Sequence, residues 1–152
     1  MGGGAAMSAE LFAAARDVAR HAHAPYSNFA VGAAVRLSDG QIVTGCNFEN
    51  ASYGMTLCAE TVALASVNAM GRLRDVREIA VIGGRIGVDG ALVDVGPVRP
   101  CGRCRQIIQE AADLSGVNLP VHCSSADGGV QETHHIDDLL PHAFGPKSLG
   151  LA

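Results

Sequence analysis

Apolar side chains near the start of the chain repeat at the three- and four-residue spacing of one helix face. They are Leu11, Phe12, Ala15, Val18 and Ala19. Ser8 stands at the expected N-cap position and Pro25 cannot continue a helix, so we predict a helix from Ser8 to about Ala22. Residues 1–7, MGGGAAM, are glycine-rich and are predicted to form a disordered lead-in.

Two apolar runs, AVGAAVRL and IVTGCNF, flank the dipeptide Asp39-Gly40. An Asp-Gly pair between apolar runs is typical of a tight hairpin turn, so we predict two antiparallel strands over residues 30–37 and 41–48. A polar loop leads into LCAETVALASVNAM, residues 57–70, which is rich in alanine and contains no helix breaker. This stretch is predicted to be a buried helix.

The second half of the chain continues with strands and one long helix. EIAVIGG predicts a third strand, a variable loop covers about residues 84–99, and CGRCRQIIQEAADL predicts a helix from Cys101 to near Gly116. VNLPVHCSS and VQETHHI predict a fourth and a fifth strand. Only A-D-G-G separates these two strands, which is too short for a parallel crossover, so we predict them to be antiparallel. A helical turn, IDDLLP, and a mobile tail from about Phe144 complete the chain.

These elements predict an α/β fold with one mixed, five-stranded sheet, antiparallel strands 4 and 5, and helices on both faces. The 152 residues, of which 48% are hydrophobic and only 17% charged, are enough for one domain with a real core over residues 1–152. In such sheets the usual place for a site is where strand ends lie beside helix starts.

The charge distribution argues against nucleic acid and membranes as partners. The net charge is −4, and one lysine and ten arginines are scattered rather than gathered in a basic stripe. No apolar run approaches the ~20 residues of a membrane span. The first residues have neither the basic nor the apolar region of a secretion signal, so we expect a cytoplasmic protein.

Five cysteines, an odd number, argue against a disulfide framework in such a protein. Cys101 and Cys104 follow Pro100 at a spacing that points both thiols the same way in a first helical turn, and Cys58 opens another predicted helix. Helix N-termini favour the thiolate, which is the form that binds zinc. Three thiolates leave a fourth position for water or substrate, as is typical of catalytic zinc.

Glu60 follows Cys58 by two residues and can address this open position without being a ligand. A carboxylate there can accept a proton from zinc-activated water and deliver it elsewhere, which is worth roughly 10²–10⁴ in rate. Alone, the CxxC pair would suit a thiol-redox couple as well as a metal site, and Glu60 favours the catalytic metal. Cys46 and Cys123 lie in predicted strands and are expected to be inert core thiols.

Five motifs occur in order along the chain and together resemble those of the free-nucleoside cytidine deaminases. They are FAVGAA (29–34), GCNFENASYG (45–54), CAE (58–60), PCGRCRQ (100–106) and FGPxxL (144–149). The C-A-E and P-C-x-x-C segments are similar to the Cys₃ variant of the zinc deaminase signature. The resemblance implies a three-layer α/β/α cytidine deaminase-like fold and hydrolytic deamination of cytidine and 2′-deoxycytidine in pyrimidine salvage.

The resemblance also implies a role for individual residues. Cys58, Cys101 and Cys104 would bind one Zn²⁺ per chain, and Glu60 would move protons from the attacking water to N3 of cytosine and then to the departing amine. The substrate contacts implied within one chain are Asn47 and Glu49 at the ribose, the Ala59 backbone at the base, and Phe29 in the pocket wall. In a homotetramer with shared active sites, neighbouring subunits would add Phe144 over the base and Ala51 and Tyr53 near the sugar.

One position departs from the family pattern. Many Cys₃ members have arginine after the C-A-E glutamate, where it donates to the thiolates, and this chain has Thr61. Three thiolates and Zn²⁺ sum to −1, so we expect Arg103, inside the cysteine loop, to tune the site. Two alternatives remain open: a blasticidin S-type deaminase with the same chemistry, and a non-catalytic zinc or thiol-redox domain.

Overall fold

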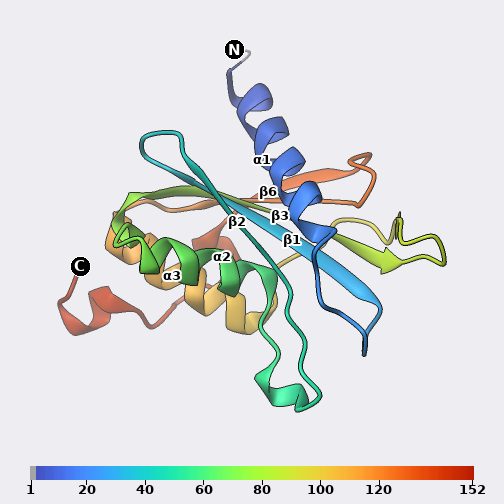
Figure 1. Ribbon diagram of the computed structural model, residues 1–152. Coiled ribbons are helices and arrows are strands. Elements are labelled where there is room, and N and C mark those ends of the chain that lie inside the picture. The colour runs from blue at the N-terminus through green and yellow to red at the C-terminus, as the bar shows by residue number, and fades with distance from the viewer. Residues whose placement is uncertain (1–2) are drawn as a thin grey trace.

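A mixed sheet of six strands forms the middle of the molecule, and helices cover both of its faces (Figure 1). The computed structural model describes residues 3–152. The strands are β1 (Phe29–Leu37), β2 (Ile42–Cys46), β3 (Val76–Ile86), β4 (Leu92–Val93), β5 (Pro120–Ser124) and β6 (Gln131–His135). They follow the order β2-β1-β3-β5-β6, and the short β4 pairs with one end of β3. The predicted α/β class with a mixed sheet is confirmed.

Strand directions follow from the length of the connections. β1 runs antiparallel to both β2 and β3, β3 and β5 are parallel, and β5 and β6 are antiparallel. The long connection from β3 to β5 includes α3, whereas a short turn joins β5 to β6, as predicted from A-D-G-G. The antiparallel arrangement predicted for the last two long strands is therefore confirmed.

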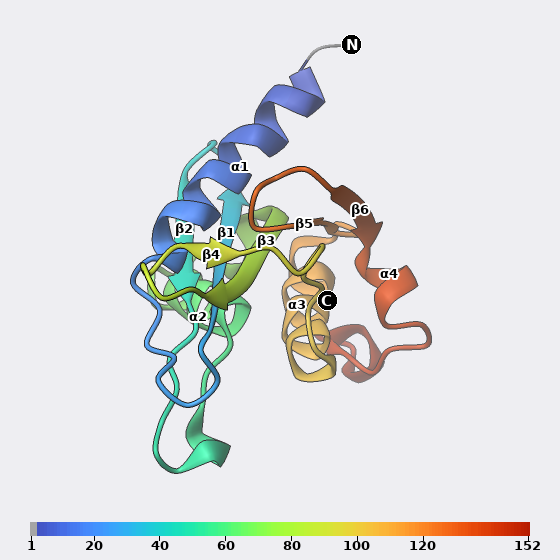
Figure 2. The ribbon, with the colours of Figure 1, turned by 90° about the vertical axis from the view of Figure 1, so that its right-hand side faces the viewer.

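The helices divide into two layers (Figures 1 and 2). They are α1 (Gly3–Ala19), α2 (Ala59–Ala69), α3 (Gly102–Ser115) and α4 (Ile136–Leu139), with 3₁₀ turns η1 (Tyr53–Met55), η2 (Leu73–Asp75) and η3 (Pro146–Leu149). α1 lies across one face of the sheet, and α2 and α3 lie against the other. Alternation along β1 serves both layers, because Ala34 packs in the α1 cluster and Ala33 and Val35 pack in the α2/α3 cluster.

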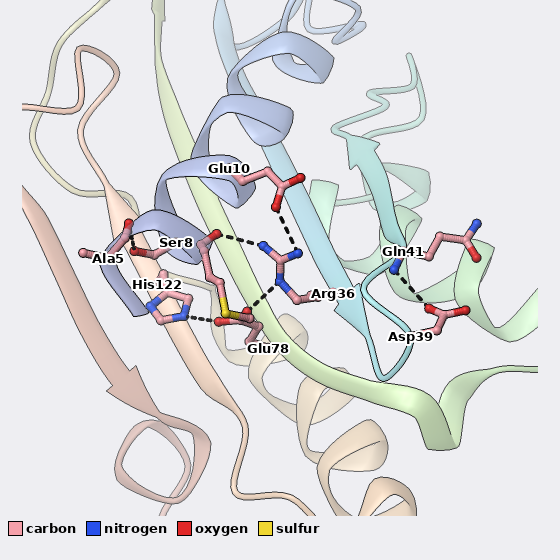
Figure 3. A network of polar contacts seen from close by, with 9 residues as sticks. Ala5, Ser8, Glu10, Arg36, Asp39, Gln41, Glu78 and His122 are labelled. Atoms are coloured by element: carbon pink, nitrogen blue, oxygen red, sulfur yellow. Dashed lines mark hydrogen bonds and ion pairs between the residues drawn. The ribbon is translucent and has the colours of Figure 1, made fainter. Parts of the chain in front are cut away.

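The start of α1 differs from the prediction. Gly3–Met7 belong to the helix, so for these residues the disordered lead-in is wrong, and Met1 and Gly2 lie outside the described residues. Ser8 is not an N-cap, because its hydroxyl donates to the Ala5 carbonyl inside the helix (3.1 Å). A polar network beneath α1 contacts the helix at Met7 and Glu10 (Figure 3).

Arg36 of β1 forms the centre of this network. Its guanidinium donates to the Met7 carbonyl (2.8 Å), to Glu10 (3.2 Å) and to Glu78 of β3 (2.8 Å), and Glu78 in turn contacts His122 of β5 (2.8 Å) (Figure 3). Arg36 is buried, so its charge requires these partners. The network fixes the first turns of α1 to the sheet.

Two further differences lie in loops. The predicted loop at 84–99 contains β4, which forms a hairpin with β3 around Gly90, so the sheet has six strands rather than five. The tail is not a free end, because Gln106 of α3 donates to the Phe144 carbonyl (2.7 Å) and Asp113 accepts from the Lys147 amide (3.1 Å). No helix among residues 3–152 is long and apolar enough to cross a membrane.

Candidate metal centre and active site

Two helix starts bring three cysteines together. Cys58 is the N-cap of α2, Cys101 is the N-cap of α3, and Cys104 lies in the first turn of α3. Their Sγ atoms all lie within 4.8 Å of one another, and those of Cys58 and Cys101 are 3.8 Å apart. Within the described residues this is the only cluster of three or more metal-ligating side chains this close.

The cluster fits zinc. Tetrahedral zinc with Zn–S distances of about 2.3 Å places its sulfur ligands about 3.8 Å apart, which matches the Cys58–Cys101 separation. Thiolates are soft ligands that suit zinc, and both helix N-termini direct a partial positive charge at them. The three sulfurs supply the usual protein ligand count of a catalytic site and leave one position open.

The protons of the metal-free cluster are unevenly shared. A hydrogen bond from Cys104, a second from Cys101 and the charge of Arg103 lower the pKa of Cys58 to about 6. The hydrogen bond to Cys58 and burial raise the pKa of Cys104, which is fully buried. Cys58 is therefore the thiolate of the pair and Cys104 holds the proton, which a metal ion has to displace.

Glu60 lies where the sequence predicted it, in the first turn of α2 beside the sulfurs. Its side chain is only 4% exposed, and its Oε2 lies 3.5 Å from the Cys104 Sγ. Burial raises the pKa of this carboxyl group. A raised pKa makes a carboxyl group better suited to holding and then releasing a proton.

A cavity of about 190 Å³ opens next to this cluster. It is lined by Val31, Asn47, Thr56, Leu57, Cys58, Ala59, Glu60, Val98, Arg99 and Cys101. The structure thus brings together the metal ligands Cys58 and Cys101, the candidate acid-base Glu60, and two of the predicted substrate residues, Asn47 and Ala59. A larger cavity, of about 680 Å³, lies on the α1 side of the sheet and contains none of the predicted site residues.

The predicted ribose contacts are held by their own chain. The Asn47 side chain accepts from the Val31 amide (2.8 Å) and donates to the Phe29 carbonyl (2.8 Å). Glu49 accepts from the backbone amides of Tyr26 (2.9 Å) and Ser27 (3.2 Å) and from the Ser27 hydroxyl. The Ser27 hydroxyl, followed by these amides, lowers the pKa of Glu49 and keeps it ionised.

The other predicted substrate residues do not line the cavity within one chain. Phe29 packs against β3 near Gly83. Tyr53 is 72% exposed and contacts Tyr26 in a tilted arrangement with ring centroids 5.4 Å apart. Phe144 is 64% exposed, and Ala51 is exposed. The last three are the residues that the resemblance assigns to neighbouring subunits.

Several residues that line this cavity were not predicted from the sequence. Val98 and Arg99 directly precede Pro100 and Cys101, so their position next to the cysteine motif was the available signal. Arg99 is held by a two-pronged ion pair with Glu132 of β6 (2.9 and 2.6 Å). Arg103 directs its guanidinium to the Thr56 carbonyl (3.4 Å), and its charge acts on the Cys58 thiol across space.

Comparisons with known proteins agree with this site. Residues 7–118 match a family model described as the cytidine and deoxycytidylate deaminase zinc-binding region. A cytidine deaminase of Sporosarcina psychrophila is 38% identical over 143 residues, covering 94% of this chain and 95% of its own length. One from Mycobacterium tuberculosis H37Rv is 41% identical over 138 residues, covering 89% and 87%. The crystal structure of cytidine deaminase from Burkholderia pseudomallei superposes with a TM-score of 0.76 at 41% identity, covering 90% of this chain and 98% of that one.

Proposed function

The chain belongs to the family of cytidine and deoxycytidylate deaminases, and from this and the geometry of its site we propose that it hydrolyses cytidine and 2′-deoxycytidine. The products are uridine or 2′-deoxyuridine and ammonia. The observation that carries the proposal is a three-sulfur cluster, one ligand short of closure, beside the buried Glu60 at the wall of a cavity.

One Zn²⁺, held by Cys58, Cys101 and Cys104, supplies the Lewis acid that makes water nucleophilic at neutral pH. Glu60 accepts the proton that the attacking water loses as its oxygen bonds to C4 of the cytosine ring. Glu60 donates this proton to N3, then takes the second proton from the new C4 hydroxyl and delivers it to the amino group. The C4–O bond becomes a carbonyl as the C4–N bond breaks and ammonia leaves. Because Glu60 is buried, water does not compete for these protons.

The base and sugar are held by groups on the cavity wall. The Asn47 amide retains one N–H and one acceptor lone pair after its two contacts with β1, which suits a ribose hydroxyl. The Ala59 backbone at the start of α2 orients the base, Glu49 accepts from a second hydroxyl, and Phe29 adds apolar surface. The Glu49 carboxylate already accepts hydrogen bonds from Tyr26 and Ser27, so it can contact the sugar only by accepting an additional hydrogen bond or by giving up one of these.

We further propose that residues 1–152 act as a single domain that assembles into a homotetramer with shared active sites. The cavity of one chain is smaller than the ~300–1,000 Å³ of typical ligand pockets, so a nucleoside needs walls from elsewhere. Tyr53, Phe144 and Ala51 are available for this purpose because each is exposed. An apolar groove of about 390 Å³ between α2 and α3, lined partly by Leu64, Ala65 and Ile107, offers a contact surface.

Salvage of pyrimidine nucleosides in the cytoplasm is the setting that we propose for this reaction. All five cysteines are free in the structure, including the exposed Cys101, which suits a reducing compartment. The substrate is a small nucleoside, and we propose no nucleic-acid or membrane partner.

The decisive experiment follows the loss of cytidine absorbance together with the release of ammonia. Glu60→Gln should retain one zinc per chain and lose about 10²–10⁴ of the rate. Asp138→Asn, at an exposed position of α4, is the control and should keep the parental rate. Turnover of Glu60→Gln near the parental value would remove Glu60 from the mechanism, and bound zinc without any turnover in the parent would favour the non-catalytic zinc domain.

The blasticidin S-type alternative uses the same chemistry on a different cytosine compound. Asn47 lines the cavity and keeps unused hydrogen-bonding capacity that a ribose hydroxyl could satisfy, which supports the ordinary nucleoside as substrate. We expect kcat/KM for cytidine and 2′-deoxycytidine to exceed that for blasticidin S, and Asn47→Ala to raise KM for the nucleosides only. The reverse order of kcat/KM values would select the alternative.

A further inference from the structure

The zinc site needs hydrogen-bond donors, because three thiolates around one Zn²⁺ carry a net charge of −1. The two arginines that flank Cys104 in the sequence are engaged elsewhere. Arg103 donates to the Thr56 carbonyl (3.4 Å), and Arg105 donates to the carbonyls of Pro100 (2.9 Å) and Leu139 (2.9 Å). Within residues 3–152 no arginine or lysine forms a hydrogen bond with any of the three sulfurs.

Thr61 does contact one of the sulfurs. Its Oγ1 lies 3.6 Å from the Sγ of Cys104, within hydrogen-bond range for sulfur. Either atom can be the donor while Cys104 is a thiol. A zinc ligand is a thiolate and has no proton to give, so in the loaded site only the Thr61 hydroxyl can donate.

The buried surroundings of Cys104 strengthen its hydrogen bond with Thr61. Cys104 is fully buried, so water does not reach its sulfur, and a hydrogen bond there acts in a medium of low polarity. Thr61 lies in the first turn of α2, on the wall of the groove between α2 and α3. Threonine in a helix favours two rotamers, and the one that Thr61 adopts here places its hydroxyl next to the Cys104 sulfur.

We propose that Thr61 is a positioning residue of the zinc site, and that its hydroxyl donates to the Cys104 thiolate. Thr61 is thus a neutral hydrogen-bond donor at a position where a cationic donor would also cancel charge. Its hydroxyl orients and stabilises the ligand sulfur, and the loaded site keeps its negative charge. The Thr61 hydroxyl acts on Cys104, whereas the charge of Arg103 acts on Cys58. The two contributions can therefore be separated by mutation.

The test compares Thr61→Val, which keeps the shape and removes the hydroxyl, with Thr61→Ser, which keeps the hydroxyl. Zinc affinity is measured by competition with a chromophoric chelator, and the sulfur–metal charge-transfer band is recorded after cobalt substitution. Loss of an outer partner of a metal ligand costs about 10–100-fold in affinity, so we expect that loss and a shifted band for Thr61→Val. Thr61→Ser should stay close to the parent in both measurements.

Thr44→Val, on β2 with its side chain on the α1 side of the sheet, is the matched control and should leave both measurements unchanged. If Thr61→Val does not fold, Thr61→Ala provides the same comparison against Thr61→Ser. Parental affinity and spectrum in a folded variant that lacks the hydroxyl would overturn the proposal. So would an equal loss in Thr61→Ser, because packing rather than the hydroxyl would then be responsible. Neither readout depends on substrate, so failure here leaves the proposed deamination untouched.

Discussion

The guanidinium of Arg105 donates to the carbonyl of Pro100 over 2.9 Å, and Pro100 directly precedes the N-cap cysteine of α3. The same guanidinium donates to the Leu139 carbonyl at the end of α4 (2.9 Å). One half-buried side chain therefore holds the backbone that carries Cys101 and ties it to the C-terminal part of the chain.

Arg105→Met should loosen the cysteine loop, because it keeps the bulk of the side chain and removes every donor. Hydrogen bonds to charged groups are worth about 1.5–3 kcal/mol, so we expect the free energy of unfolding to fall by about 2 kcal/mol. Zinc should also dissociate faster. Denaturant unfolding and chelator-induced zinc release check both effects.

Arg77→Met is the matched control for this prediction. Arg77 also donates to two carbonyls, those of Arg74 and Val76, but both lie close to it in sequence and far from the cysteines. We expect its zinc release to be unchanged. Equal zinc release from Arg105→Met and the parent would mean that the Pro100 contact does not position the ligand.

The low pKa of Cys58 predicts a pH dependence in the metal-free protein. Since this pKa is lowered to about 6, Cys58 is a thiolate above about pH 6 and should be the first cysteine alkylated by iodoacetamide at pH 7. Cys104, whose pKa is raised and which is buried, should react last. Peptide mapping by mass spectrometry after alkylation at a series of pH values measures the midpoint.

Arg103→Ala removes a positive charge that favours this thiolate, so the midpoint for Cys58 should move to higher pH. Arg20→Ala, at the exposed position directly after α1, should leave this midpoint in place. An unchanged midpoint, together with unchanged zinc affinity, would end the role that the sequence suggested for Arg103.

Much of this site was readable from the sequence because its residues follow local rules. A helix N-terminus favours a thiolate, and a three-residue spacing aligns two thiols, so Cys101 and Cys104 could be placed together without a structure. The short distance between Cys58 and Cys101 does not follow from a local rule, because it is created by the packing of α2 beside α3. The motif resemblance supplied that contact.

The structure differs from the sequence-based predictions mainly where contacts between residues far apart in the chain determine the local structure. Arg36 approaches α1 from β1 and donates to the Met7 carbonyl, a contact that has no signature in residues 1–7. The β4 hairpin did have a local signal, since Asp89-Gly90 repeats the Asp-Gly turn that identified the first hairpin, and Gly90 has a positive φ of 80°. The exposure of Tyr53 and Phe144 depends on how the whole chain folds.

Gly45 should be intolerant of a side chain. A Cβ atom at this position of β2 would lie 2.4 Å from the Ala63 amide nitrogen and 2.7 Å from the Ala59 carbonyl oxygen. Both atoms belong to the α2 backbone, so the helix that carries Cys58 and Glu60 would have to move. Overpacking of this kind costs about 1–3 kcal/mol, and we expect Gly45→Ala to lose that much stability and part of its zinc affinity.

Gly54→Ala is the control, because a Cβ atom there would meet nothing within 4 Å. Its unfolding midpoint should match that of the parent. A Gly45→Ala protein as stable as the parent would show that α2 can shift without cost, and the close approach of β2 would then have no structural importance.

The groove between α2 and α3 should be the surface through which copies of the chain assemble. Ala65 is exposed on the wall of this groove beside Leu64 and Ile107. A charged side chain there should leave the fold of the single chain intact but disrupt an apolar contact between two chains. Light scattering of the parent should give about four times the chain mass of 15.6 kDa, and Ala65→Glu should give smaller species. Activity should fall with dissociation, because each cavity would lose the walls supplied by its neighbours.

Ala13→Glu, on the exposed side of α1, controls for the added charge and should keep both mass and activity. A parent that is monomeric and fully active would refute the shared-site arrangement, and an Ala65→Glu protein that retains both mass and activity would place the contact surface elsewhere.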